Sequence, residues 1–130
     1  MNRAPVSPET AGPATGESRA WWVVCLCAGW CGTCRDYRPI FEDLARAHPG
    51  VRFEWVDVED ESELAGDRDV ETFPTVLIAD GSRALFLGPL LPQAQVLARL
   101  LGSLQTAHAA PGAGHEAQAV FERVRAARAQ

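Results

Sequence analysis

Apolar and polar residues follow one another along this chain in patterns that predict a series of strands and helices. The stretch WWVVCLCA at 21–28 is continuously apolar, which is typical of a central strand buried on both faces. Residues 32–47 instead place apolar side chains three and four positions apart, as an amphipathic helix does, and Pro39 predicts a kink there. The remaining predicted elements are a strand at 51–58, a short acidic helix at 60–69, strands at 75–79 and 83–87 around an Asp80-Gly81 turn, and helices at 92–104 and 115–129.

The order of these elements, βαβαββα with tails, predicts an α/β fold. Alternating strands and helices favour parallel pairing with helices on both faces, and the hairpin adds antiparallel strands. We therefore expect a central mixed sheet of about four strands, flanked by helices, with an extra C-terminal helix. The chain is expected to divide into a flexible, Pro- and Gly-rich tail at 1–20, a domain at 21–104, a linker at 105–114 and a C-terminal helix at 115–130.

Composition and charge narrow the classes of function. The chain has 130 residues, of which 47% are hydrophobic and 22% charged, as expected for one soluble globular domain. Its formal net charge of -5 argues against nucleic acid and against an anionic membrane surface, since both bind clustered Lys and Arg. No apolar stretch reaches the roughly 20 residues that span a bilayer, and the polar N-terminus lacks the apolar centre of a secretory signal. We therefore expect a cytoplasmic protein with no nucleic acid and no membrane as partner.

Candidate chemistry is concentrated in one short motif, Trp30-Cys31-Gly32-Thr33-Cys34. The motif stands between the buried strand and the first helix, so Cys31 falls at the helix N-terminus. Free backbone N–H groups and the positive end of the helix dipole stabilise a thiolate at that position. Thiolate is the species that attacks a disulfide, and Cys34, one turn along, is placed to attack the resulting mixed disulfide. Gly32 leaves the approach to Cys31 open, which suggests that the substrate is a disulfide of another protein.

Residues 21–104 resemble the thioredoxin family, and the resemblance rests on more than the two cysteines. It covers about two-thirds of the chain. The matching residues are Trp30 directly before the first cysteine, Pro39 in the helix, Phe73-Pro74 at the start of the third predicted strand, and Gly88 after the hairpin.

The resemblance implies a thioredoxin-like fold and a thiol–disulfide oxidoreductase, with Cys31 as nucleophile and Cys34 as resolving thiol. It also implies that Pro74 carries a cis peptide bond beside the two cysteines, and that an extended substrate segment pairs with the Phe73 backbone. Expected partners are protein disulfides and a separate thioredoxin-reductase-like electron donor, and we expect a monomer with no bound cofactor and no metal. The substrate groove implied in this way comprises Trp30, Gly32, Thr33, Phe73, Pro74 and Gly88.

The sequence departs from the family pattern at three positions. Thr33 replaces the usual proline between the cysteines, and because the intervening residues tune redox poise, a more oxidising pair is a hypothesis. Cys25 and Trp55 stand where the family has a buried Asp and Lys, so the polar pair that assists proton transfer is absent. The proton of the resolving thiol must then go to water, Glu59 or Asp57, and we expect slower resolution near neutral pH.

Several alternative interpretations stay open. Cys25 and Cys27 lie two apart in a buried strand, where free cysteine packs as a small hydrophobe and a disulfide between them is disfavoured. All four cysteines together form a candidate zinc set, although ligands shared between a core strand and a helix require an unusual geometry. A reductase is the simplest function, and an oxidant or isomerase differs from it in potential and compartment. The main alternative is a thioredoxin-fold binding or chaperone-like module with incidental redox activity, because the polar proton-transfer pair is missing.

Overall fold

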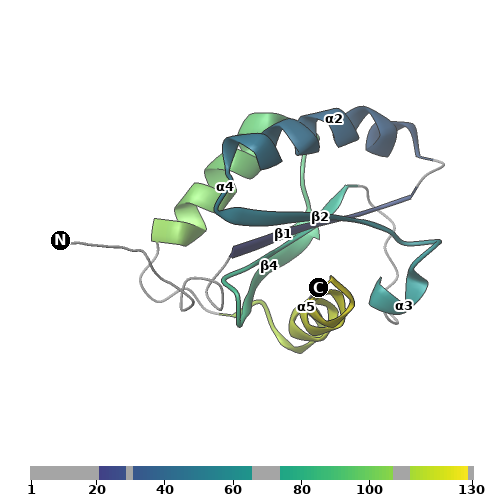
Figure 1. The fold of residues 1–130 in the computed structure, drawn as a ribbon, viewed down its shortest axis with the longest axis vertical. Coiled ribbons are helices and arrows are strands. Elements are labelled where there is room, and N and C mark those ends of the chain that lie inside the picture. The colour runs from purple at the N-terminus through teal and green to yellow at the C-terminus, as the bar shows by residue number, and fades with distance from the viewer. Residues whose placement is uncertain (1–20, 29–30, 66–73, 107–111, 129–130) are drawn as a thin grey trace.

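A mixed β-sheet forms the centre of the protein (Figure 1). The computed structural model describes residues 21–28, 31–65, 74–106 and 112–128. Within these residues the sheet has four strands in the spatial order β2-β1-β3-β4. The strands are β1 Trp21–Cys27, β2 Val51–Asp57, β3 Thr75–Ala79 and β4 Ala84–Pro89.

The strand pairing follows from the two kinds of connection in the chain. β1 and β2 run parallel and are joined through the long helix α2 (Gly32–Ala47), whereas β3 pairs antiparallel with both β1 and β4. The β3–β4 hairpin turns at Asp80, whose carboxylate accepts hydrogen bonds from the backbone N–H groups of Ser82 and Arg83. Gly81 has a φ of 100° in this turn, which glycine adopts without strain. The predicted hairpin is therefore confirmed.

Helices cover both faces of the sheet (Figure 1). α2 and α4 (Ala94–Thr106) pack on one face, and α3 (Ser62–Ala65) and α5 (His115–Arg128) lie on the other. Successive β1 side chains alternate between these two layers, as the period of a strand requires. The predicted α/β class, with its mixed sheet, flanking helices and C-terminal helix, is confirmed.

Helix α5 belongs to the hydrophobic core. Its inward-facing residues are each at most 2% exposed. The Phe121 ring meets the Trp22 ring edge to face, with 5.8 Å between the ring centroids, an arrangement that aromatic pairs favour. The buried residues that α5 contributes are Ala117, Val120, Phe121 and Val124.

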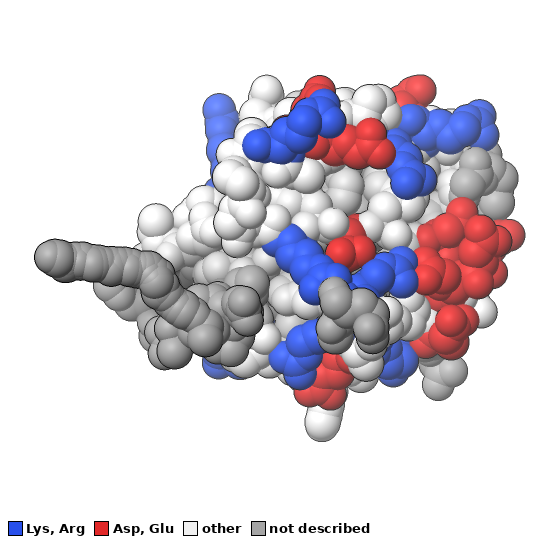
Figure 2. Space-filling view, viewed as in Figure 1, with Lys and Arg blue, Asp and Glu red and all other residues white. Residues whose placement is uncertain are grey.

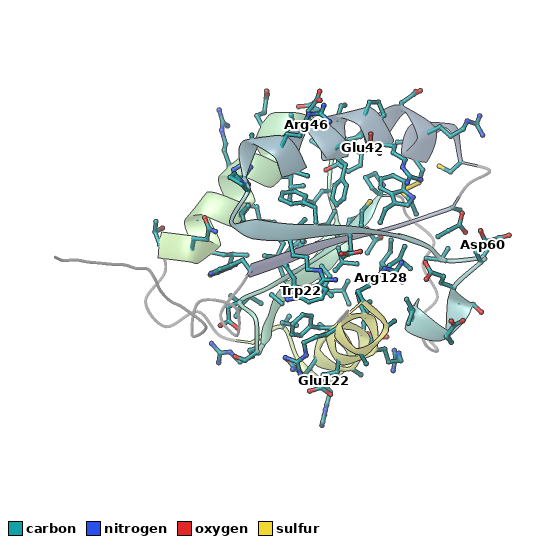
Figure 3. The ribbon with its side chains drawn as sticks, in the orientation of Figure 1. Trp22, Glu42, Arg46, Asp60, Glu122 and Arg128 are labelled. Atoms are coloured by element: carbon teal, nitrogen blue, oxygen red, sulfur yellow. A yellow bond between two sulfur atoms is a disulfide. The ribbon has the colours of Figure 1, made fainter. Side chains whose placement is uncertain are left out.

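Arg128 ties the end of α5 to β2 and to the segment before α3 (Figure 3). Its guanidinium donates hydrogen bonds to Glu54 at 3.1 Å and to Glu61 at 2.8 Å. It also donates to the backbone carbonyl of Trp55. These charge-assisted hydrogen bonds hold the C-terminal end of α5 against β2 and against the turn that precedes α3.

The predicted element bounds agree with the structure to within two residues at most ends. The helix predicted at 92–104 begins at Ala94 and continues to Thr106, into the predicted linker. The acidic helix predicted at 60–69 is described only over Ser62–Ala65, and 66–69 lie outside the described residues, as does the predicted tail at 1–20. No helix in the described part of the chain is long and apolar enough to cross a membrane.

Candidate active site

Three strands meet at the end of the sheet where Pro74 and Gly88 lie. β1 ends at Cys27, and the antiparallel register pairs the preceding Leu26 with Thr75, the first residue of β3. Pro74 directly precedes Thr75 and is buried, and its carbonyl accepts a hydrogen bond from Leu90. The last residues of β4 reach this same end of the sheet, where Gly88 pairs with Val76 of β3. The carboxyl end of β1 therefore lies beside Pro74.

Cys31 occupies the N-cap of α2, as the sequence predicts. Its backbone is extended, with φ -83° and ψ 123°, and its carbonyl accepts the first helical hydrogen bond, from Arg35. No side chain caps this end of the helix, so no capping side chain satisfies the backbone N–H groups of the first turn. Cys31 is partly exposed, and Gly32 and Thr33 beside it are exposed. The N-cap residue is therefore partly open to solvent, whereas Cys34 is buried.

The disulfide joins Cys27 to Cys34, and Cys31 is a free thiol. The motif predicts a Cys31–Cys34 pair, so the pairing in this structure differs from that expectation. The Cα atoms of Cys27 and Cys34 are 5.8 Å apart, within the range of roughly 4.4–6.8 Å that disulfides require. Both residues are at most 1% exposed. The bond is therefore sealed under the first turn of α2.

The interpretation of Cys25 and Cys27 as packing residues is right for Cys25 and wrong for Cys27. Cys25 is a fully buried free thiol in the layer beneath α2. Cys27 shares that face but stands at the last position of the strand, directly below the helix that carries Cys34. The sequence carried only part of the signal for this contact. Cys27 stands near the end of the apolar run at 21–28 and position 34 falls on the inward face of the helix, but neither pattern gives the distance between the two elements.

Among the described residues beneath α2, the Cys25 thiol and the Tyr37 hydroxyl keep their protons near neutral pH. Burial raises the pKa of the Cys25 thiol far above its ordinary range, although the positive charge of Arg38 opposes this shift. Burial also raises the pKa of Tyr37, and Cys25 adds to that rise. Trp55 lies opposite Cys25 in the β1–β2 register, so an apolar ring occupies the place beside that thiol.

The outer side of the site is acidic. Asp57 pairs with Cys27 in the β1–β2 register and therefore continues the face of β2 that lies beneath α2. Its carboxylate accepts hydrogen bonds from the backbone N–H groups of Glu59 and Asp60. Further acidic side chains gather at this end of the molecule, over the turn between β2 and α3 (Figure 2). Of the two acceptors suggested by the sequence, Asp57 stands in register with a cysteine of the site.

The structure describes one further residue of the predicted groove. Gly88 is buried on β4, in register with Val76, and a side chain there would press against the Phe86 ring at 3.3 Å. Trp30 and Phe73 lie outside the described residues. Among the described residues, no three His, Cys, Asp or Glu side chains are grouped so as to hold a metal ion.

A thiol at a helix N-terminus, placed at the end of a mixed sheet between helical layers, is the arrangement of thioredoxin-fold thiol proteins. A family model described as Thioredoxin matches residues 14–89, more than half of the chain. The chain belongs to the thioredoxin family.

Individual relatives support this assignment. The chain is 41% identical over 63 residues to a rice "Thioredoxin H-type", over 52% of that protein's length. It is 34% identical over 96 residues to a Brassica napus "Thioredoxin H-type 1", covering 74% of this chain and 78% of the relative. The chain spans about half the length of the rice protein and of a Streptomyces coelicolor "Putative thioredoxin 2".

Solved structures agree with the sequence relatives. A Fasciola hepatica thioredoxin superimposes with a TM-score of 0.60 at 28% identity, over 68% of this chain and 84% of that one. The Drosophila thioredoxin Deadhead gives the same TM-score of 0.60 at 22% identity, over 69% of this chain and 86% of that one, and shows the shared fold.

Proposed function

We propose that this protein is a thiol–disulfide oxidoreductase that reduces disulfides in other proteins. The observation that carries the proposal is the contrast between two cysteines one helical turn apart. Cys31 is accessible at the N-cap of α2, whereas Cys34 is buried and forms a disulfide within the chain. An accessible nucleophile backed by a buried thiol that can form an internal disulfide is what two-step disulfide exchange requires.

The reaction transfers two electrons to the partner protein. The Cys31 thiolate attacks one sulfur of the partner disulfide, forms a mixed disulfide and releases the first partner thiol. The Cys34 thiolate then attacks the Cys31 sulfur, which forms the Cys31–Cys34 disulfide and releases the second partner thiol. A separate reductase restores both thiols, and the chain needs no bound cofactor for either step.

We expect the substrate to bind at the end of the sheet where β1 ends and β3 begins. Gly88 and Pro74, which precedes β3, lie at the end of the sheet where β1 ends. Gly32 and Thr33 are exposed beside Cys31. Trp30 and Phe73 complete the groove by family resemblance. An extended partner segment would pair there with backbone groups, as in other cases of strand addition.

Asp57 is the base we assign to the resolving step. Cys25 and Tyr37 keep their protons because burial raises the pKa of both groups. Asp57 stands beside Cys27 in register, on the face of the sheet that carries the disulfide. We further propose a monomeric, cytoplasmic protein that works with a thioredoxin-reductase-like donor.

The test of the function is a covalent trap. A Cys34→Ser variant, reduced and mixed with insulin as a disulfide probe, should accumulate a mixed disulfide between Cys31 and an insulin chain. The matched control is Cys31→Ser/Cys34→Ser, which should form no covalent complex. A complex that forms equally well without Cys31, or non-covalent retention of the probe by both variants, would favour the binding-module alternative.

Redox direction is tested by the reduction potential, measured by thiol trapping after equilibration in glutathione buffers. A potential near the roughly -270 mV of thioredoxin supports the reductase. A potential nearer the roughly -120 mV of strong oxidants would show that the chain donates disulfides, with Thr33 as the first residue to test.

A further inference from the structure

Cys27 is a third cysteine within bonding reach of the predicted redox pair. It ends β1, is fully buried, and is bonded to Cys34 across a Cα–Cα separation of 5.8 Å. The same structure leaves Cys31 as an accessible thiol. The internal disulfide of this structure is therefore buried and does not include Cys31, the proposed nucleophile.

The neighbouring Cys25 does not share this role. Its sulfur lies 3.8 Å from the Cys27 sulfur and its thiol donates a weak hydrogen bond to it, but the two are not bonded. Cys25 lies deeper along β1, opposite Trp55, and its high pKa keeps it protonated. Cys27 and Cys25 are equally buried and share one face, so they form a natural pair of test and control positions.

We propose that Cys27 is a second redox partner for Cys34, and that the oxidised protein moves its disulfide inward to Cys27–Cys34, freeing Cys31 as a single reactive thiol. This inference rests on the proposed function. The Cys27 sulfur attacks the Cys34 sulfur of the Cys31–Cys34 disulfide as its thiol proton is lost. The Cys27–Cys34 bond forms, the Cys31–Cys34 bond breaks, and the electron pair leaves with Cys31, which takes up the proton that Cys27 lost. No external oxidant or reductant is consumed.

The inward move gives the oxidised protein an activity that the reduced protein lacks. Cys31 can again attack a disulfide, but Cys34 is now bonded to Cys27 and cannot resolve the product. The product is a long-lived mixed disulfide at Cys31. Glutathione disulfide serves as a probe of this capture, because its reaction with Cys31 gives a glutathione adduct and one released glutathione thiolate.

The move also places the disulfide out of reach of external reductants. Both bonded residues are at most 1% exposed, so a reductant thiol has no direct path to either sulfur. The Cys31 thiolate, by contrast, is one turn from Cys34 and can attack that sulfur to return the disulfide to the accessible Cys31–Cys34 form. Cys31 is therefore the expected entry point for reduction as well as for oxidation.

The first experiment maps the disulfide in the oxidised wild-type chain. The protein is oxidised with diamide, pulsed briefly with iodoacetamide in its folded state, then denatured in acid with N-ethylmaleimide to block the remaining thiols. Chymotryptic cleavage after Leu26 and Trp30 separates Cys25, Cys27 and the Cys31–Cys34 segment for mass spectrometry. We expect the Cys27 fragment to be disulfide-linked to the 31–34 fragment, with iodoacetamide on Cys31. A disulfide confined to the 31–34 fragment, with Cys27 blocked only after denaturation, would overturn the inference.

Matched variants test the exchange itself. Oxidised Cys27→Ala should neither accept the iodoacetamide pulse at Cys31 nor form a glutathione adduct, whereas oxidised Cys25→Ala should behave as the wild-type chain does. In Cys31→Ser, dithiothreitol should reduce the Cys27–Cys34 bond at least about tenfold more slowly than in the wild-type chain, because the accessible thiol is lost. Equal rates in the two proteins would show that Cys31 does not mediate exchange.

The two proposals fail in different ways. A wild-type chain that is trapped by insulin through Cys31 yet keeps its disulfide at Cys31–Cys34 refutes only the inward move. A chain with a Cys27–Cys34 bond but no Cys31-dependent trapping refutes the oxidoreductase, and with it the exchange. In that case Cys27–Cys34 is a structural crosslink.

Discussion

Beneath α2, the buried layer of the sheet includes Cys25, Cys27 and Cys34 among its aliphatic and aromatic side chains. Beneath α5, the buried layer contains no cysteine, and Trp22 and Phe121 are its large aromatic residues. Both layers are buried, and β1 supplies alternate side chains to each. Alternate positions of β1 therefore differ in role. Those facing α2 include the thiols, and those facing α5 are buried apolar side chains. Substitutions in the two layers should therefore have separable effects.

The largest effect expected in the α2 layer is on activity. Cys31→Ser should lower the rate of dithiothreitol-driven insulin reduction by about a thousandfold or more, because no other described cysteine is accessible as a nucleophile. The melting temperature should stay near that of the wild-type chain, since Cys31 is partly exposed. Rate and melting curve measured on the same samples check both statements. Residual activity within tenfold of wild type would move the nucleophile elsewhere.

The matching substitution in the α5 layer should affect stability alone. Phe121→Ala removes a fully buried ring and its edge contact with Trp22, and should cost about 3–5 kcal/mol in the free energy of unfolding. The exposed neighbour Glu122→Ala is the control and should stay within about 0.5 kcal/mol. Urea unfolding measures both. If folded Phe121→Ala also lost insulin reduction, the two layers would not be separable.

Asp57 lies where the acidic turn meets the thiol layer, so its effect should be kinetic. Asp57→Asn keeps an oxygen for the backbone N–H groups of Glu59 and Asp60 but removes the base. We expect the resolving step to slow about tenfold at neutral pH.

Glu59→Gln is the control for the base, since the sequence alone allows either carboxylate. Single-turnover release of the insulin mixed disulfide, followed by rapid quench, isolates the resolving step from the first attack. If Glu59→Gln slowed resolution and Asp57→Asn did not, the assignment of the base would be reversed.

Arg128 should contribute a smaller, pH-dependent stabilisation to the α5 layer. Its hydrogen bond lowers the pKa of Glu61 in the folded chain, so the interaction stabilises the fold above the ordinary glutamate range. Arg128→Met should cost about 1 kcal/mol at pH 7, a modest value because both side chains are partly exposed. The difference from wild type should diminish below about pH 4, as Glu61 becomes protonated. Urea unfolding at several pH values checks this, and a difference that did not change with pH would point to lost packing instead.

Local patterns in the sequence were enough to predict most of the fold. The continuous apolar run at 21–28 and the three-and-four spacing at 32–47 each depend on neighbours along the chain, and both elements form as predicted. The Cys31 N-cap followed from the same local reasoning. That Pro74 directly precedes the third strand also agrees with the sequence, and the β1–β3 register places it at the end of the sheet where β1 ends.

Contacts between distant elements were harder to predict. The Cys27–Cys34 bond depends on how β1 and α2 stack, and spacing within either element does not report the gap between them. Arg128 lies 67 residues from Glu61 in the chain, so no periodicity links the two. The packing of α5 into the core depends on the same kind of distant contact, because the sequence shows only an amphipathic pattern for this helix.

The smallest expected effect comes from Tyr37 and has the opposite sign. Its hydroxyl is buried in the α2 layer and finds no hydrogen-bond partner among the described residues. An unpaired buried hydroxyl opposes folding, because it loses its hydrogen bonds to water without replacement. Tyr37→Phe keeps the ring and its packing near Phe41, and should raise the free energy of unfolding by up to about 1 kcal/mol. Urea unfolding of reduced and oxidised protein measures the gain. A loss of stability in the reduced protein alone would indicate that the hydroxyl bonds to a thiol once the Cys27–Cys34 bond opens, which would extend the redox site inward to Tyr37.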